Sequence, residues 1–146
     1  DGKPVPANLT GTINGDLFSS PDGLAFDAAG RLWIQTDYDD IEPAMHNMAC
    51  NQLLCADPTT REVRRFLVGP VNCEITGVVV TPDGKTLFFN VQHPGEDAEK
   101  ANFATNTFTS YWPGNQPGIS SSHAGRKRPR SATVVVTRKD GGTIAI

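Results

Sequence analysis

Two acidic residues occupy matching places in the chain and are candidates for metal chemistry. Asp22 comes just before an apolar stretch that begins at residue 23, and Glu74 precedes a similar stretch that begins at residue 77. Two carboxylates held close together repel each other unless a cation lies between them. Their oxygens suit a hard cation such as calcium, or an oxygen-ligated iron. The pair therefore predicts a metal site with Asp22 and Glu74 as ligands.

Neighbouring polar residues leave two interpretations open. Asp22 lies within a Ser-Pro-Asp-Gly sequence, where an aspartate commonly caps its own backbone. Asp37 and Asn51 flank a connection, and they either line the same site or close turns. We favour turn closure but keep Asp37 as a third candidate metal ligand. His93 and Glu96 are ambiguous in the same way, because a lone histidine is more often a hydrogen-bonded structural residue than a ligand.

Other reactive groups in the sequence form no recognised motif. The chain has neither a Gly-x-Ser-x-Gly nucleophile motif nor a glycine-rich phosphate loop. Its odd cysteine count argues against a fully paired disulfide framework. Cys50 and Cys55 are close enough in sequence to pair, but we interpret both, together with Cys73, as small buried apolar residues. We interpret the basic run at residues 126–130 as a solvated loop, although arginines there could contact phosphate.

A repeated strand, tight turn and strand must position the candidate carboxylates. Residues 23–37 (GLAFDAAGRLWIQTD) resemble residues 77–91 (GVVVTPDGKTLFFNV) at an offset of 54 or 55 residues. Apolar and β-branched residues flank a turn in each copy, at 27–30 and at 81–84. Each turn ends in glycine, which adopts a positive φ at little cost. Both copies are therefore predicted to be β-hairpins.

A second hairpin follows each copy, at residues 52–67 and 132–146. Four strands in meander order make one blade of a β-propeller, so we predict an all-β fold with two four-stranded antiparallel blades. The first strand of each blade lines the central channel, which would bring Asp22 and Glu74 to one channel mouth. A two-sheet sandwich without propeller closure is the alternative. The predicted divisions are a lead-in at 1–19, one blade at 20–70, and a second blade at 71–146 with a long insertion at 92–131.

Net charge, apolar run length and chain length limit the partners that this chain can have. The net charge of −3 argues against a nucleic-acid partner, which would favour a basic surface. No apolar run approaches the roughly 20 residues of a membrane span, and no secretory signal is expected within the first ten residues. Two blades cannot close a propeller or cover both sheet edges. We therefore expect the chain to pair with the rest of a propeller or with copies of itself.

Several short sequences, taken in order, resemble the carboxy-terminal part of PhoX-type bacterial alkaline phosphatases. The most specific are CEITG at 73–77, TPDG at 81–84 and QHPGE at 92–96. The others are SPDGLAFD (20–27), GRLWIQTD (30–37), NQLL (51–54), RRFLVGP (64–70), YWP (111–113) and PRSATVV (129–135). The paired Pro-Asp-Gly strands alone are less specific, because lactonase-type propellers share them.

The resemblance implies a six-bladed propeller that hydrolyses phosphomonoesters with calcium and iron at the channel mouth. It also implies export by the twin-arginine route to the periplasm or the extracellular space. Only Asp22, Glu74 and Asp37 are carried over as metal ligands, since most of that family's chain has no counterpart here. The alternatives are part of a calcium-dependent lactonase or esterase propeller, or a propeller scaffold without catalysis. The chain alone is expected to be inactive.

Overall fold

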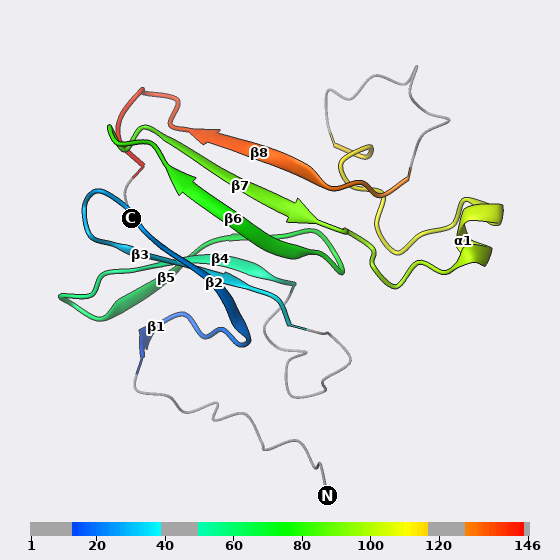
Figure 1. Ribbon diagram of the computed structural model, residues 1–146, viewed down its shortest axis with the longest axis horizontal. Helices are drawn as coiled ribbons and strands as arrows, with labels where there is room; N and C mark the ends of the chain where they lie inside the picture. Colours follow the sequence, from blue (N-terminus) through cyan, green and yellow to red (C-terminus); the bar gives the residue numbers. More distant parts are fainter. Residues whose placement is uncertain (1–12, 39–49, 117–127, 145–146) are drawn as a thin grey trace, which may run out of the picture.

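The structure is a computed structural model that describes residues 13–38, 50–116 and 128–144, and this part of the chain is mostly β. It contains two separate sheets and one short helix (Figure 1). The elements are β1 (Asn14–Gly15), β2 (Pro21–Phe26), β3 (Leu32–Thr36), β4 (Gln52–Ala56), β5 (Glu62–Val68), β6 (Glu74–Val80), β7 (Thr86–Gln92), α1 (Lys100–Thr105) and β8 (Ala132–Thr137). The all-β class expected from the repeat is confirmed.

The first sheet contains the four antiparallel strands expected of the first blade, and one more. Its order is β1-β5-β4-β3-β2, with the short β1 parallel to β5. In the β2–β3 turn, Asp27 Oδ1 accepts hydrogen bonds from the backbone N–H groups of Ala29 and Arg31, each 3.0 Å long. Gly30 ends the turn at a φ of +80°, a conformation that disfavours residues with a β-carbon. We did not predict β1, because Asn and Gly are uncommon in strands.

The second sheet has the order β6-β7-β8 and is antiparallel throughout. Its expected fourth strand, 143–146, is not formed by the described residues Thr143 and Ile144, while 145 and 146 lie outside the described part. The Ile144 N–H donates to the Gly84 carbonyl at 2.7 Å, and the Ile144 carbonyl accepts from Arg31 Nη2 at 2.8 Å. These partners satisfy the backbone groups that a further strand would have paired.

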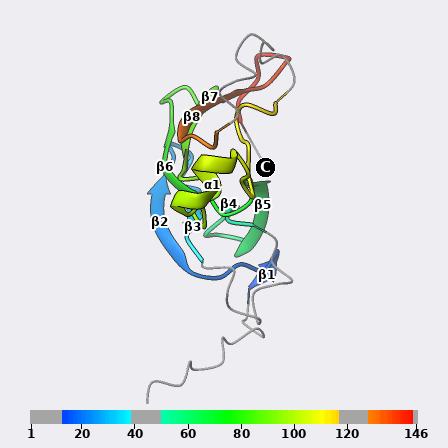
Figure 2. The same cartoon turned by 90° about the vertical axis from the view of Figure 1, so that its right-hand side faces the viewer.

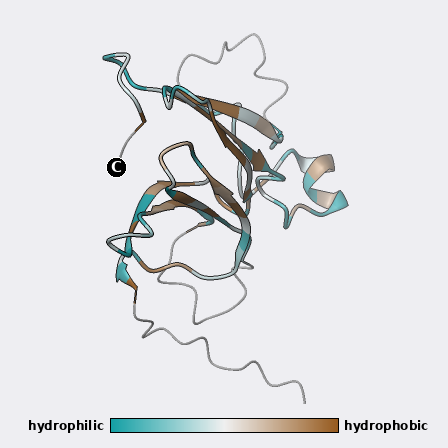
Figure 3. Cartoon of the chain, turned by 60° about the vertical axis from the view of Figure 1, so that its left-hand side comes forward, coloured by the Kyte–Doolittle hydropathy of each residue, from teal (hydrophilic) through white to brown (hydrophobic). Residues whose placement is uncertain are grey.

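An apolar core joins the two sheets. Figure 3 shows hydrophobic strands in both sheets. The buried core residues are Trp33, Leu53 and Cys55 from the first sheet, with Cys73, Ile75, Val78, Leu87, Phe89, Val91 and Ile144 from the second half of the chain. A second cluster of Ile34, Leu54 and Val63 lies in the first sheet. Successive strand residues point to opposite faces, so Trp33 and Ile34 belong to different clusters.

The connection between β7 and β8 leaves the sheets at one end and carries α1. Figure 1 shows α1 beyond the ends of the strands, and Figure 2, viewed from that side, shows it in front of them. The helix begins with a reciprocal capping box, in which the Glu99 N–H donates to Asn102 Oδ1 at 2.7 Å. The helix occupies Lys100–Thr105. In the described part of the chain, no helix is long and apolar enough to cross a membrane.

Candidate functional site

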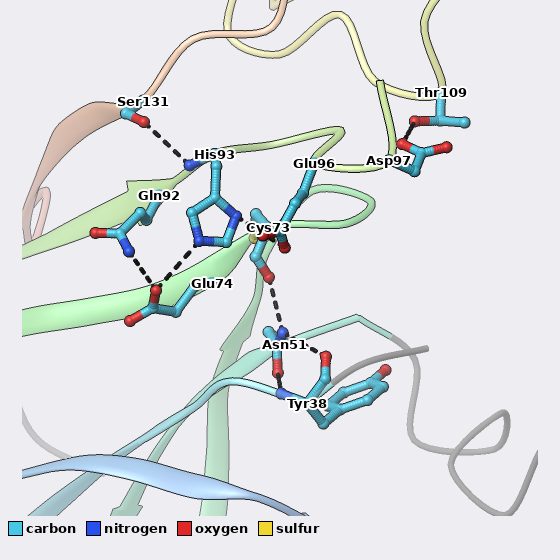
Figure 4. Close-up of polar contacts among 10 residues, drawn as sticks. All are labelled: Tyr38, Asn51, Cys73, Glu74, Gln92, His93, Glu96, Asp97, Thr109 and Ser131. Carbon is cyan, nitrogen blue, oxygen red and sulfur yellow. Dashed lines mark hydrogen bonds and ion pairs between the residues drawn. The ribbon is translucent and has the colours of Figure 1, made fainter. Parts of the chain in front are cut away.

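The Glu74 side chain is the best-defined element of the candidate site. Glu74 is the first residue of β6, and only 7% of it is exposed. It lies opposite Gln92 in the antiparallel register of β6 and β7. Gln92 Nε2 donates a hydrogen bond to Glu74 Oε2, and His93 Nε2 lies 3.3 Å from the same oxygen (Figure 4). Two nitrogen-bearing side chains from the neighbouring strand end therefore converge on one carboxylate oxygen.

The second oxygen of this carboxylate, Oε1, has different surroundings from Oε2. Within the described residues, Glu74 Oε1 makes no hydrogen bond, and neither lysine nor arginine pairs with the carboxylate. Buried carboxylates are normally paired with a cation or coordinate one. Metal-binding carboxylates are also commonly oriented by hydrogen bonds from surrounding groups. The environment of Glu74 thus fits a carboxylate that offers Oε1 to a cation.

His93 has an unusual backbone that places its ring between two carboxylates. Its φ is +32°, uncommon for a residue with a β-carbon, and its N–H donates to Ser131 Oγ at 3.0 Å. Its Nδ1 lies 3.2 Å from Glu96 Oε2, but among the described residues this buried nitrogen has no hydrogen-bond partner. Strained backbone of this kind is often found at functional sites. The sequence left His93 and Glu96 ambiguous, because their approach to Glu74 depends on the pairing register of β6 and β7.

Asp22 and Asp37 lie at the same end of the two sheets as Glu74. β2 and β6 are neighbours and run in the same direction (Figure 1), and Asp22 and Glu74 lie near the starts of these strands. Asp37 follows β3, and its N–H donates to the Ser20 carbonyl at 3.1 Å. Both aspartates are exposed. Within the described residues, no hydrogen bond or ion pair joins either of them to Glu74.

The described residues do not complete a metal site. Across 13–38, 50–116 and 128–144, no group of three or more His, Cys, Asp or Glu side chains is arranged to hold a metal ion. A complete site built on Glu74 would therefore need further ligands from outside the described residues, beyond any that Asp22 and Asp37 supply. The assignment of Asp22, Glu74 and Asp37 as metal ligands remains a prediction.

Asn51 closes the connection between β3 and β4 with its side chain, as expected for a turn residue. It is 5% exposed. Its Oδ1 accepts from Thr36 Oγ1 at 2.7 Å and from the Tyr38 N–H at 2.8 Å. Its Nδ2 donates to the carbonyls of Tyr38 at 3.1 Å and Cys73 at 2.8 Å (Figure 4). Asn51 therefore links the end of the first hairpin to the residue that precedes Glu74.

The cysteines behave as apolar residues. All three lie among the described residues, where Cys55 and Cys73 are buried free thiols and Cys50 is partly buried. Burial raises the pKa of Cys73 to about 12 and that of Cys55 to about 11. Both thiols are therefore protonated at neutral pH and carry no charge in the core. This agrees with their interpretation as small core residues.

The basic run at 126–130 is described only from Arg128 onward. The Arg128 guanidinium lies over the Phe103 ring, 5.6 Å from its centroid, and the residue is exposed. A cation over an aromatic ring gains a modest electrostatic stabilisation. Arg128 therefore has a packing role in the long connection, while Arg126 and Lys127 lie outside the described residues.

Comparison with known proteins identifies similar sequences and a similar fold. Residues 1–95 match the family model of alkaline phosphatase PhoX. The structure is also similar to that of Pseudomonas fluorescens PhoX in complex with vanadate, a transition state analogue, with 45% sequence identity and a TM-score of 0.70. The match covers 88% of this chain but only 19% of that chain. No curated protein matches the chain.

Proposed function

Because the chain belongs to the PhoX family of alkaline phosphatases, we propose that it is the carboxy-terminal part of a longer enzyme, the parent enzyme, that hydrolyses phosphate monoesters. The observation that carries this proposal is the family match over residues 1–95, joined to 45% identity with a PhoX protein of known structure. The chain spans 19% of that protein, so activity belongs to the parent enzyme. The rest of its propeller is the partner we expect for these two sheets.

Calcium and iron are the proposed cofactors of the parent enzyme. The Glu74 carboxylate supports this, because its Oε2 is held by Gln92 and lies beside His93 while its Oε1 has no partner in the described residues. Bound cations would supply Lewis-acid stabilisation of the phosphoryl oxygens and a more acidic water. Gln92 and His93 would orient Glu74. Asp22 and Asp37 are the further ligands we propose from this chain.

We place the parent enzyme in the periplasm or outside the cell, exported by the twin-arginine route. The support for this placement is the family resemblance alone. Fractionation of the bacterium of origin, with phosphatase activity and the protein followed together by antibody, tests it. Retention of both in the cytoplasm would contradict the placement.

Substrate class is tested with purified, metal-loaded parent enzyme. We expect turnover of p-nitrophenyl phosphate, no turnover of a simple lactone, and inhibition by vanadate. Vanadate adopts the five-coordinate geometry of phosphoryl transfer, so a site complementary to that transition state binds it more tightly than substrate. Lactone hydrolysis without phosphatase activity would instead support the calcium-dependent lactonase or esterase alternative. Absence of both activities would support a scaffold without catalysis.

A further inference from the structure

The Asn51 side chain uses its full hydrogen-bonding capacity inside the protein. An amide oxygen accepts two hydrogen bonds and an amide nitrogen donates two. Asn51 makes all four, to Thr36 Oγ1, to the backbone N–H and carbonyl of Tyr38, and to the Cys73 carbonyl. A buried polar group that loses its partners is costly. The orientation of this amide is therefore tightly determined.

The four bonds join two segments that carry candidate carboxylates. Thr36 and Tyr38 flank Asp37 at the end of β3, whereas Cys73 directly precedes Glu74 at the start of β6. The Asn51 main chain adds another contact, since its carbonyl accepts from the Gly69 N–H at 2.7 Å. Figure 4 shows Asn51 between Tyr38 and Cys73, close to the Glu74 and His93 group. Asn51 thus connects the first sheet to the strand start that presents Glu74.

A second buried amide anchors the same strand farther along. β6 is an edge strand of its sheet, and its pairing with β7 shifts register between Thr76 and Val79. The Val78 N–H donates instead to Gln35 Oε1 of β3, at 2.8 Å. β6 is therefore attached to the first sheet by amide side chains at both its start and its middle. Asn51 is the attachment nearest to Glu74.

We propose that Asn51 is a positioning residue, which fixes the start of β6 against the end of β3 so that the Glu74 carboxylate is presented to the metal site. The inference rests on the proposed function for the metal role of Glu74, whereas the positioning of β6 does not depend on a metal. Loss of the Asn51 donors should free the Cys73 carbonyl and loosen the backbone at Glu74. Metal binding should weaken as a consequence.

The test compares Asn51→Asp with Asn102→Asp in the full-length parent enzyme. Asn51→Asp keeps the shape but removes both donors to the Tyr38 and Cys73 carbonyls. Asn102 is a matched control, because it also accepts a backbone N–H through Oδ1 and donates Nδ2 to a backbone carbonyl, that of Thr107, at 2.9 Å. It lies in α1 and makes none of the contacts around Glu74.

The first readout is hydrogen exchange in the metal-free enzyme. We expect the backbone amides at 74–76 to exchange about tenfold faster in Asn51→Asp, because the variant loses the free energy of one or two buried hydrogen bonds. In Asn102→Asp their exchange rates should not change. If Asn51→Asp does not fold, the unsubstituted enzyme remains informative. Its Tyr38 amide should exchange as slowly as strand amides, although it lies outside a strand. Unchanged exchange at 74–76, or a rapidly exchanging Tyr38 amide, would overturn the proposal.

The second readout is metal retention under competition with a chelator. We expect Asn51→Asp to lose about 10–100-fold in apparent metal affinity while Asn102→Asp retains it. Faster exchange at 74–76 with unchanged metal affinity would overturn the positioning role. Metal retention by Glu74→Gln distinguishes failure of the Asn51 proposal from failure of the proposed metal role of Glu74. If Glu74→Gln also keeps its metal, the metal role of Glu74 is wrong, and exchange alone then decides whether Asn51 fixes β6.

Discussion

At the residue scale, buried polar side chains connect the two sheets at opposite ends of the strands. Asn51 does so beside the candidate site, and Asp27 and Arg31 do so at the hairpin turns. Asp27 accepts hydrogen bonds from Arg31 Nε at 2.7 Å and Trp33 Nε1 at 3.0 Å, and Arg31 continues to the Ile144 carbonyl. The Asp27 side chain is only 2% exposed. Such charge-assisted bonds in a buried setting stabilise the fold when both partners are present.

The Asp27 network gives the first prediction, a pH-dependent loss of stability. Burial alone would raise the pKa of Asp27, but hydrogen bonds from Trp33 and Arg31 and the Arg31 charge together lower it. A lowered folded-state pKa means that ionised Asp27 stabilises the fold above its unfolded pKa of about 3.9, and that this contribution disappears as pH falls through the folded value. Asp27→Asn should cost about 1–3 kcal/mol at neutral pH.

Denaturant unfolding of the parent enzyme at several pH values checks this prediction. The stability difference between unsubstituted enzyme and Asp27→Asn should shrink below about pH 4. Asp57→Asn is a comparison for turn hydrogen bonding without burial, since Asp57 is exposed and hydrogen bonds from Thr59 and Thr60 also lower its pKa. A difference that stays constant down to pH 2 would show that the Asp27 charge does not contribute.

At the element scale, sequence patterns predicted the hairpins better than their pairing. The glycine-ending turns at 27–30 and 81–84 located β2, β3, β6 and β7, because turn chemistry and apolar flanks are local properties. Strand pairing depends on residues far apart in the sequence. The sequence therefore predicted neither the parallel strand β1 nor the absence of a strand at Thr143 and Ile144. The same holds for the site. Position in the repeat indicated Glu74, but the contact of His93 with it needed the register of β6 and β7.

Gly77 provides an element-scale prediction about the irregularity in β6. Gly77 has a φ of +64°, and a β-carbon there would lie 2.4 Å from Asn90 Nδ2. Asn90 cannot move freely, since its Oδ1 accepts from Thr133 Oγ1 at 2.7 Å. Gly77→Ala should therefore destabilise the parent enzyme by more than the roughly 1 kcal/mol expected for the backbone conformation alone.

Gly141→Ala isolates the contribution of the backbone conformation. Gly141 has a φ of +70°, but a β-carbon there would meet no atom within 4 Å. The difference between the losses of unfolding free energy in Gly77→Ala and Gly141→Ala gives the cost of the contact between the new β-carbon and Asn90. Equal losses for Gly77→Ala and Gly141→Ala would show that β6 accommodates a β-carbon without strain.

At the scale of the whole molecule, the two sheets expose apolar surface that a longer propeller would cover. Leu24 and Phe26 of β2 are 62% and 70% exposed, and Val79 of β6 and Val135 of β8 are also exposed. Exposed apolar residues on strands favour association with further protein. Neighbouring blades of the parent enzyme are the partner we propose, and copies of the chain would substitute for them when it is isolated.

This surface predicts opposite effects of one substitution in two contexts. Phe26→Glu should reduce self-association of the isolated 146-residue chain, because it adds charge to an exposed strand, and should destabilise the parent enzyme, where the residue would be covered. Sedimentation of the chain and thermal unfolding of the parent measure the two effects. Thr137→Glu, on an exposed position of β8, is the control. A parent enzyme unaffected by Phe26→Glu would contradict coverage by another blade.

The isolated chain should also lack phosphatase activity. Catalysis needs several oriented ligands and charge-stabilising groups together, and the described residues supply no complete metal site. Turnover of p-nitrophenyl phosphate by purified, metal-loaded chain is the measurement, with a mock purification as background. Turnover clearly above that background would show that the chain carries a complete active site.

The central claim is that Glu74 binds metal for phosphatase chemistry, and one comparison tests it most directly. Metal content and turnover should be measured for the parent enzyme carrying Glu74→Gln, which removes the charge but keeps the side-chain size. Glu62→Gln is the matched control, at the start of a strand in the first sheet, where the carboxylate pairs with the exposed Arg64. We expect Glu74→Gln to lose metal and at least about 10–100-fold in activity with its fold retained, and Glu62→Gln to lose neither. A Glu74→Gln enzyme with full metal content and normal turnover would contradict the claim.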